Sequence, residues 1–172
     1  MSKILKNSEL DISTASSIVS NTLNKCDDGE LYLEDSKSES IVIDDNKIKN
    51  TNYTTDLGYG FRAVTGDVIA YSHSNEISEK SLNSSSQNLK STLKSQKGTY
   101  NYEIKKTNQK FYKDLDPVES KSLKDKIELL NEINNYSRSK DSSVKQVTAN
   151  FLGEQKNIEI LRSGGELLND KR

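Results

Sequence analysis

The sequence contains one histidine, His73, and one cysteine, Cys26, and these two residues limit the chemistry that the chain can perform. A zinc site takes three or four protein ligands, and His73 with Cys26 and scattered carboxylates makes no recognisable set. The helical zinc motifs HExxH and HExxxH need two histidines and are therefore impossible here. We predict no metal site in this chain and interpret His73 as a surface-loop residue.

His73 would also have to serve as the base for any serine or cysteine nucleophile. No serine stands in a Gly-x-Ser-x-Gly segment, the turn that exposes a catalytic serine in many hydrolases. We therefore assign no catalytic residue in this chain.

The segment Gly58-Tyr59-Gly60-Phe61-Arg62-Ala63 superficially resembles a dinucleotide-binding fingerprint. That fingerprint needs a glycine turn that opens a helix, so that the helix N-terminus meets the pyrophosphate. Here the apolar residues alternate with period two and a turn follows at Gly66, which indicates a strand instead. The glycines then mark a place where another backbone or a bound peptide approaches closely. We take Asp56, Gly58, Gly60 and Arg62 as candidates for contact with a peptide or a partner.

The acidic pairs and the tyrosines have ordinary structural explanations. Each acidic pair is expected at a turn or a strand end, where solvated carboxylates are common. The tyrosines lack the interleaved basic residues of a nucleic-acid stacking platform, so we assign them to core and rim packing. The acidic pairs are Asp27-Asp28, Glu34-Asp35 and Asp44-Asp45.

Composition excludes several classes of partner. The net charge of −1 comes from scattered charges, mostly lysine on the basic side, which gives no reason to expect nucleic acid. No apolar run is long enough for a membrane span, and the first residues lack the apolar core of a secretory signal. A single cysteine agrees with a reducing compartment, so we expect a cytoplasmic protein without membrane contact.

Apolar periodicity predicts an α+β fold, a two-layer sandwich of a largely antiparallel sheet with about three helices. A stripe with spacings of three and four indicates a helix from Asp11 to Cys26, and a weaker stripe indicates a second from Ser78 to Leu93. A third helix follows the start signal at Ser122 and ends between Arg138 and Asp141.

Period-two alternation predicts the strands, and the short links between them favour an antiparallel meander. The predicted strands are 30–34, 40–44, 57–64, 68–71, 147–152 and 158–161, with turns at 44–46, 65–67 and 163–166. Residues 95–116 show no period and are predicted to form a connecting loop with one strand near 100–104. A last strand begins at Leu167-Leu168, where the end of the chain leaves its ladder incomplete. Such an edge can recruit another strand, so we expect self-association, fraying of residues 163–172 or binding to a complementary fragment.

Several segments, in the same order and spacing, are similar to the amino-terminal domain of the TldD/PmbA family of metallopeptidases. The segment with the strongest similarity is Asp56–Gly66, DLGYGFRAVTG, which resembles that family's Gly-x-Gly-x-Arg-Ala segment. The other similar segments are Glu30-Leu31-Tyr32, Glu39-Ser40, Asp45–Lys49, Phe111-Tyr112, Asp116-Pro117 and Val144–Ala149.

The resemblance implies a zinc-dependent peptidase that cleaves unfolded peptides and is assembled from a TldD and a PmbA (TldE) subunit. In that family an HExxxH helix and a later cysteine hold the zinc in the carboxy-terminal domain, and Cys26 does not match that cysteine. The resemblance therefore predicts a tail over residues 1–9 and, over residues 10–172, a TldD/PmbA amino-terminal domain truncated before the metal-binding domain. Zinc is expected only in the missing domain, so the chain is expected to be inactive alone.

Three hypotheses follow from this resemblance. The first is the substrate-side and assembly domain of a TldD-like peptidase, whose partners are a carboxy-terminal TldD-like domain or a PmbA/TldE-like subunit, with a peptide as substrate. The second is a non-catalytic module that captures extended peptides or a partner subunit at its sheet edges. The third is a non-functional remnant of a truncated gene.

Overall fold

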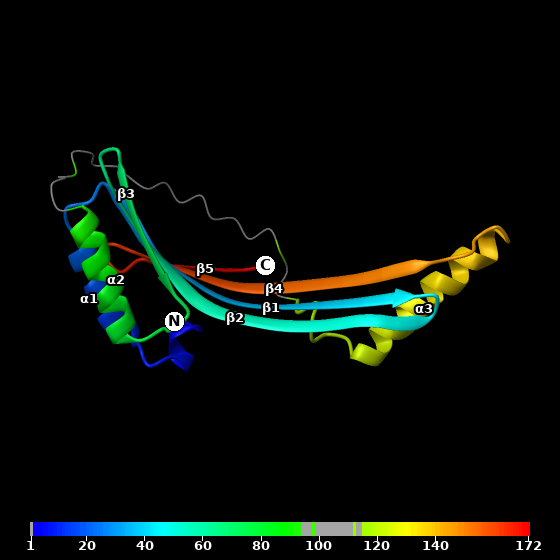
Figure 1. Cartoon of the computed structure of the whole chain (residues 1–172). Coiled ribbons are helices and arrows are strands. Elements are labelled where there is room, and N and C mark those ends of the chain that lie inside the picture. The colour runs from blue at the N-terminus through cyan, green and yellow to red at the C-terminus, as the bar shows by residue number, and fades with distance from the viewer. Residues whose placement is uncertain (1, 94–97, 99–111, 113–114) are drawn as a thin grey trace. The chain divides into compact units, whose positions relative to one another are not determined.

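The computed structural model describes residues 2–93, 98, 112 and 115–172 (Figure 1). The chain divides into two compact units, each made from separate parts of the sequence. The first unit comprises residues 1–35, 56–111 and 157–171, and the second comprises 36–55, 112–156 and 172. The predicted loop over 95–116, with its strand near 100–104, lies almost entirely outside the described residues.

The described residues form one five-stranded sheet in the order β3-β2-β1-β4-β5. Strand β2 pairs with β3 in antiparallel register, and β4 pairs with β5 in the same way. The strands are β1 (Asp28–Asp44), β2 (Lys47–Thr65), β3 (Val68–Ser74), β4 (Thr148–Arg162) and β5 (Leu167–Lys171). The helices are a 3-10 turn, η1 (Leu5–Asn7), and α1 (Ile12–Leu23), α2 (Glu79–Thr92) and α3 (Leu123–Lys140). The predicted α+β class with three α-helices is confirmed.

Four of these strands are longer than the sequence pattern predicts, and β3 continues to Ser74 instead of ending at Tyr71. The predicted strands 30–34 and 40–44 are one continuous strand, β1, and 147–152 and 158–161 are likewise one strand, β4. β2 begins at Lys47, ten residues before the predicted 57–64. The prediction failed because the joining segments are polar on both faces, whereas alternation reveals only strands with one apolar face.

The core of the first unit lies between its strands and the helices α1 and α2. Leu31, Leu33 and Phe61 have no exposed surface and point from the sheet into this core. The two helices are joined by a hydrogen bond of 2.6 Å between the hydroxyls of Thr22 and Ser86. Asp11 caps α1 and Ser78 caps α2, each accepting backbone N–H groups of the first turn. One face of the sheet in this unit is therefore covered by helices.

The core of the second unit is smaller and lies beneath α3. Ile41, Ile43, Leu130 and Ala149 form its buried cluster, and Phe151 packs against them. The predicted start signal is confirmed, because Ser122 and Asp125 form a reciprocal capping box. In the same helix, Ile133 is 44% exposed.

The predicted turn at 44–46 is confirmed as a two-residue hairpin, with Asp45 and Asn46 both at positive φ. The last strand forms a ladder, since Leu167–Lys171 pairs residue by residue with Asn157–Leu161. Whether residues 163–172 fray stays a prediction. Among the described residues, no helix has the length and apolar character to cross a membrane.

Candidate functional site

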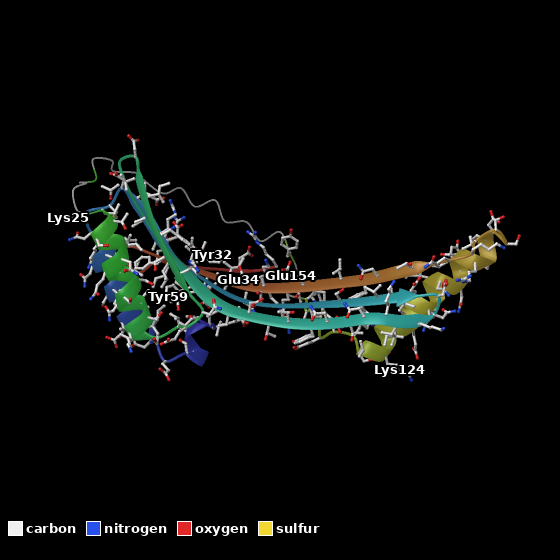
Figure 2. The ribbon with its side chains drawn as sticks, in the orientation of Figure 1. Lys25, Tyr32, Glu34, Tyr59, Lys124 and Glu154 are labelled. Atoms are coloured by element: carbon white, nitrogen blue, oxygen red, sulfur yellow. The ribbon has the colours of Figure 1, made fainter. Side chains whose placement is uncertain are left out.

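In the first unit, the sheet face opposite the helices carries polar and aromatic side chains. Tyr59 marks the covered side, where its hydroxyl lies 2.9 Å from the hydroxyl of Ser85 on α2 (Figure 2). Because side chains alternate along a strand, the even-numbered neighbours of Tyr59 on β2 lie on the opposite face. The Arg62 surface, as we call this patch, comprises Asp28 and Glu30 of β1, Gly58, Gly60 and Arg62 of β2, and Tyr71 and His73 of β3.

Two carboxylates hold the guanidinium of Arg62. Its Nε donates to Oε1 of Glu30 at 2.7 Å, and its Nη2 donates to Oε2 of Glu30 at 2.8 Å and to Oδ2 of Asp28 at 2.6 Å. This fork is the planar geometry that arginine forms with carboxylates. The hydrogen bonds to Glu30, followed by those to Asp28, raise the pKa of Arg62 above its usual range. Arg62 is therefore a fixed, permanently charged group whose Nη1 amino group takes no part in the bonds to these two carboxylates.

The two glycines of β2 make room for neighbours on β3. A Cβ at Gly60 would lie 2.5 Å from the hydroxyl oxygen and 3.1 Å from two ring carbons of Tyr71. A Cβ at Gly58 would lie 2.8 Å from the backbone oxygen of Ser74. The expected close approach of another backbone is present at Gly58, where it comes from the adjacent strand of the same chain, whereas at Gly60 the close neighbour is the side chain of Tyr71. The Tyr71 ring in turn stacks on His73, with ring centroids 5.9 Å apart.

The structure places all four candidate contact residues on β2. Gly58, Gly60 and Arg62 lie within the strand as predicted, and no helix begins there, which excludes the dinucleotide fingerprint. Asp56 is exposed further along the same strand, and alternation puts it on the same face. Their role in binding stays a prediction.

Other residue assignments needed correction. His73 lies in β3 rather than in a loop, because the strand continues to Ser74. The pair Glu34-Asp35 lies inside β1 and not at a strand end. Among the tyrosines, Tyr59 lies in the core as predicted, whereas Tyr71 is 64% exposed.

Sequence reasoning missed Tyr71, Glu30 and Asp28 as members of this surface. The signal for Tyr71 was present, because the turn after Thr65 pairs that residue with Val68 and thus sets Tyr71 opposite Arg62. The partners of Arg62 on β1 depend on a long-range register for which the local pattern gives no signal.

The described residues do not fit a zinc ion. No three His, Cys, Asp or Glu side chains in this part of the chain are close enough together to hold a metal. Cys26 lies against the core of the first unit, and its thiol faces the backbone oxygen of Thr22 at 3.7 Å. The Arg62 surface offers the guanidinium of Arg62 for hydrogen bonds and the stacked rings of Tyr71 and His73 for aromatic contact.

Two family models match the chain in sequence order. Residues 29–95 match the model described as PmbA/TldA metallopeptidase domain 1, and residues 116–172 match the PmbA/TldA metallopeptidase central domain. The Arg62 surface lies within the first matched segment.

Curated relatives give the same result. The chain is 33% identical over 147 residues to a metalloprotease TldD homolog of Buchnera aphidicola subsp. Acyrthosiphon pisum, and 29% identical over 147 residues to that of subsp. Schizaphis graminum. Each alignment covers 85% of this chain but 30% of the relative. The chain thus spans about a third of the length of the curated relatives it matches.

Solved structures share the fold at low sequence identity. A protein of Bacteroides thetaiotaomicron described as a modulator of DNA gyrase matches with a TM-score of 0.67 and 18% identity, over 92% of this chain and 38% of that one. TldE of Thermococcus kodakarensis matches with a TM-score of 0.60 and 11% identity, over 92% of this chain and 37% of that one.

Proposed function

The chain belongs to the PmbA/TldD metallopeptidase family, and from this membership we propose that it is the amino-terminal, substrate-side and assembly part of a TldD-like peptidase. The observation that carries the proposal is the ordered match of residues 29–95 and 116–172 to two successive domains of that family. In this proposal the zinc and the hydrolytic chemistry belong to a carboxy-terminal partner.

The Arg62 surface is the proposed contact site for an unfolded peptide or for the partner. An extended peptide exposes backbone carbonyls at regular intervals, and the Nη1 amino group of Arg62 is a donor of suitable type. Tyr71 and His73 add an exposed aromatic surface beside it, which favours contact with apolar side chains. Since Glu30 and Asp28 fix the guanidinium, little side-chain entropy would be lost on binding.

Reconstitution tests this proposal. The chain is mixed with a TldD-like carboxy-terminal fragment that carries HExxxH, or with a PmbA/TldE-like subunit, and sedimentation and cleavage of an unstructured peptide are measured. We expect a complex, and cleavage by the mixture that exceeds cleavage by either part alone. A mixture that neither associates nor cleaves would contradict the proposal and favour the remnant hypothesis.

The role of the Arg62 surface is tested in the same mixture with two neutralising variants. Arg62→Gln removes the fixed cation. Lys80→Gln is the control and removes an exposed cation from α2, the helix that covers the opposite face of the sheet in the same unit. We expect Arg62→Gln to weaken association or raise KM, and Lys80→Gln to leave both unchanged. Association without cleavage, sensitive to Arg62→Gln, would favour the non-catalytic binding module.

A further inference from the structure

A short segment ahead of α1, residues 2–7, lies against the core of the first unit, and we call it the N-terminal strap (blue in Figure 1). Ile4 and Leu5 are each 4% exposed and belong to the buried cluster of that unit. The strap contains the 3-10 turn η1, and such turns have poorer hydrogen-bond geometry than α-helices. The strap is therefore held mainly by its two apolar side chains and by contacts of its first residues.

Glu159 of β4 anchors the first residues of the strap. Its Oε1 accepts the backbone N–H of Lys3 at 2.5 Å and that of Ile4 at 3.3 Å. Its Oε2 accepts the hydroxyl of Ser2, whose oxygen in turn accepts the backbone N–H of Leu5 at 2.9 Å. Three donors of the strap thus converge on one carboxylate that is distant in the sequence.

This carboxylate is buried without a cation. Glu159 is 2% exposed, and within the part of the chain that the structure describes no basic side chain forms an ion pair with it. Hydrogen bonds alone offset only part of the cost of removing a charge from water. When the strap lifts away, water reaches the carboxylate and this cost disappears. The anchor therefore holds the strap closed by a small margin of free energy.

Opening the strap leaves the neighbouring elements intact. α1 has its own cap, because Asp11 accepts the backbone N–H groups of Ser13 and Thr14 at 2.9 Å each. Glu159 keeps its place in the ladder of β4 and β5, where it pairs with Asn169. Neither backbone depends on the strap, so only the strap's own contacts are lost when it opens.

The bend between the strap and α1 is loosely packed. A pocket of about 380 Å³ lies beside it, lined by Ser2 and by residues 5–6 and 8–12. Glu9 in the bend is exposed, whereas Leu10 is 2% exposed and stays with the core. Space beside a bend permits backbone rotation without the displacement of closely packed side chains. Ser8 and Glu9 are therefore suited to act as a hinge.

We propose that the N-terminal strap opens and closes as a unit about Ser8 and Glu9, with Glu159 as the latch that holds it closed. Opening uncovers the positions of Ile4 and Leu5 in the core of the first unit, together with a carboxylate that accepts backbone N–H groups. The strap thus controls access to a surface that is buried in the closed state. The inference rests on the first unit alone and does not require the proposed peptidase function.

Native-state hydrogen exchange of the whole chain, followed by NMR at urea concentrations below the unfolding transition, tests the opening. We expect the amides of Lys3, Ile4 and Leu5 to exchange through a local opening with little urea dependence, because this opening exposes little surface. The amide of Val19, which lies in α1 and has no exposed surface, should exchange more slowly and with a steep urea dependence.

Two variants test the latch. Glu159→Ala removes the carboxylate, and Ser2→Ala removes the hydroxyl that connects it to Leu5. Each should raise the exchange rate of the strap amides about tenfold, since a buried donor that loses its acceptor favours the open state. The urea dependence should stay small. Ser2→Ala changes only the strap, so it provides the test if circular dichroism shows that Glu159→Ala does not fold.

Glu166→Ala is the matched control, because Glu166 is exposed in the turn between β4 and β5 of the same unit. The strap amides of this variant should exchange at the parent rate. Two outcomes would overturn the inference. Either the strap amides of the parent chain show the steep urea dependence of Val19, so that they open only with the whole unit, or the folded latch variants exchange at the rate of the control.

Discussion

Arg62 and Glu30 form a two-point ion pair on the exposed face of the sheet, with 2.7 Å between Nε and Oε1 and 2.8 Å between Nη2 and Oε2. The pair joins neighbouring strands β1 and β2, and Asp28 shares the same guanidinium at 2.6 Å. Removing the cation would leave two carboxylates close together, so the pair fixes both the strand contact and the local charge balance.

The first prediction concerns this pair. Arg62→Ala should lower the free energy of unfolding by about 1 kcal/mol, a value kept small because the side chains are partly exposed. Arg62→Lys should recover less than half of the loss, since an ammonium cannot reproduce the fork. Urea unfolding measures both. If the Arg62→Lys variant is as stable as the parent chain, charge alone matters and the fork contributes nothing.

Local signals predicted the parts of the fold that local chemistry controls. The capping box of Ser122 and Asp125 and the hairpin turn at Asp45-Asn46 were visible in the sequence because each motif is complete within four residues. The apolar alternation around Phe61 likewise placed Arg62 on the opposite face of β2. These features needed no knowledge of distant residues.

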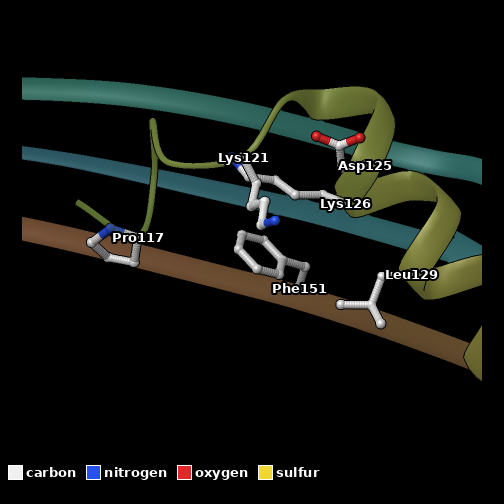
Figure 3. A pocket seen from close by; sticks show the side chains of 6 residues that line it. All are labelled: Pro117, Lys121, Asp125, Lys126, Leu129 and Phe151. Carbon is white, nitrogen blue, oxygen red and sulfur yellow. The ribbon is translucent and has the colours of Figure 1, made fainter. Parts of the chain in front are cut away.

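The sequence could not predict features held together by distant partners. Residues 35–39 of β1 look like a polar link, yet they continue the strand, and Lys37 there forms ion pairs with Asp116 and Glu119 at 2.6 and 2.7 Å. A pocket beside Phe151 combines Pro117, the first turns of α3 and β4, which are separate in the sequence (Figure 3). Backbone ladders and long-range ion pairs add no periodic signal to the residues that form them.

The second prediction tests the close approach at Gly60. Gly60→Ala should destabilise the chain by about 1 kcal/mol, because the new methyl group forces the Tyr71 ring out of its position. In a Tyr71→Ala background the same change should cost nothing or stabilise, since alanine suits a strand better than glycine. A double-mutant cycle by urea unfolding measures this coupling. Additive effects would mean that the ring does not occupy the space above Gly60.

The third prediction concerns a buried ion pair of the second unit. The Lys126 ammonium donates to the carboxylate of Glu39 and to the backbone oxygen of Val118, and the two side chains are 4% and 13% exposed. Lys126→Met should cost about 3 kcal/mol, because it leaves the Glu39 carboxylate buried without a cation. The double variant Lys126→Met with Glu39→Leu should regain most of this stability, as apolar replacement of both partners often does.

Lys124→Met is the matched control for this pair. Lys124 is 83% exposed and lies 3.7 Å from Glu128 on the surface of the same helix. Its replacement should change the free energy of unfolding by no more than about 0.5 kcal/mol. A double variant as unstable as Lys126→Met alone would show that lost packing, rather than the unpaired carboxylate, causes the destabilisation.

The last prediction follows from the cap of α1. The carboxylate of Asp11 accepts hydrogen bonds from the hydroxyls of Ser13 and Thr14, at 2.5 and 2.6 Å, and from their backbone amides, both at 2.9 Å. These bonds, that from the Ser13 hydroxyl foremost, hold the pKa of Asp11 well below its usual range. A carboxyl whose pKa is lower in the folded state than in the unfolded chain stabilises the fold above the unfolded pKa, about 3.9 for aspartate. That stabilisation is lost as the pH falls through this value toward the folded pKa.

The asparagine side chain introduced by Asp11→Asn accepts the same backbone amides without titrating. All other carboxyls are common to both proteins, so their effects cancel in the difference. The stability of the parent chain relative to Asp11→Asn, measured by urea unfolding, should therefore be greatest near neutral pH and should shrink below about pH 4. A difference that stays constant down to about pH 3 would show that the cap carries no linked proton and that neutral hydrogen bonds explain it fully.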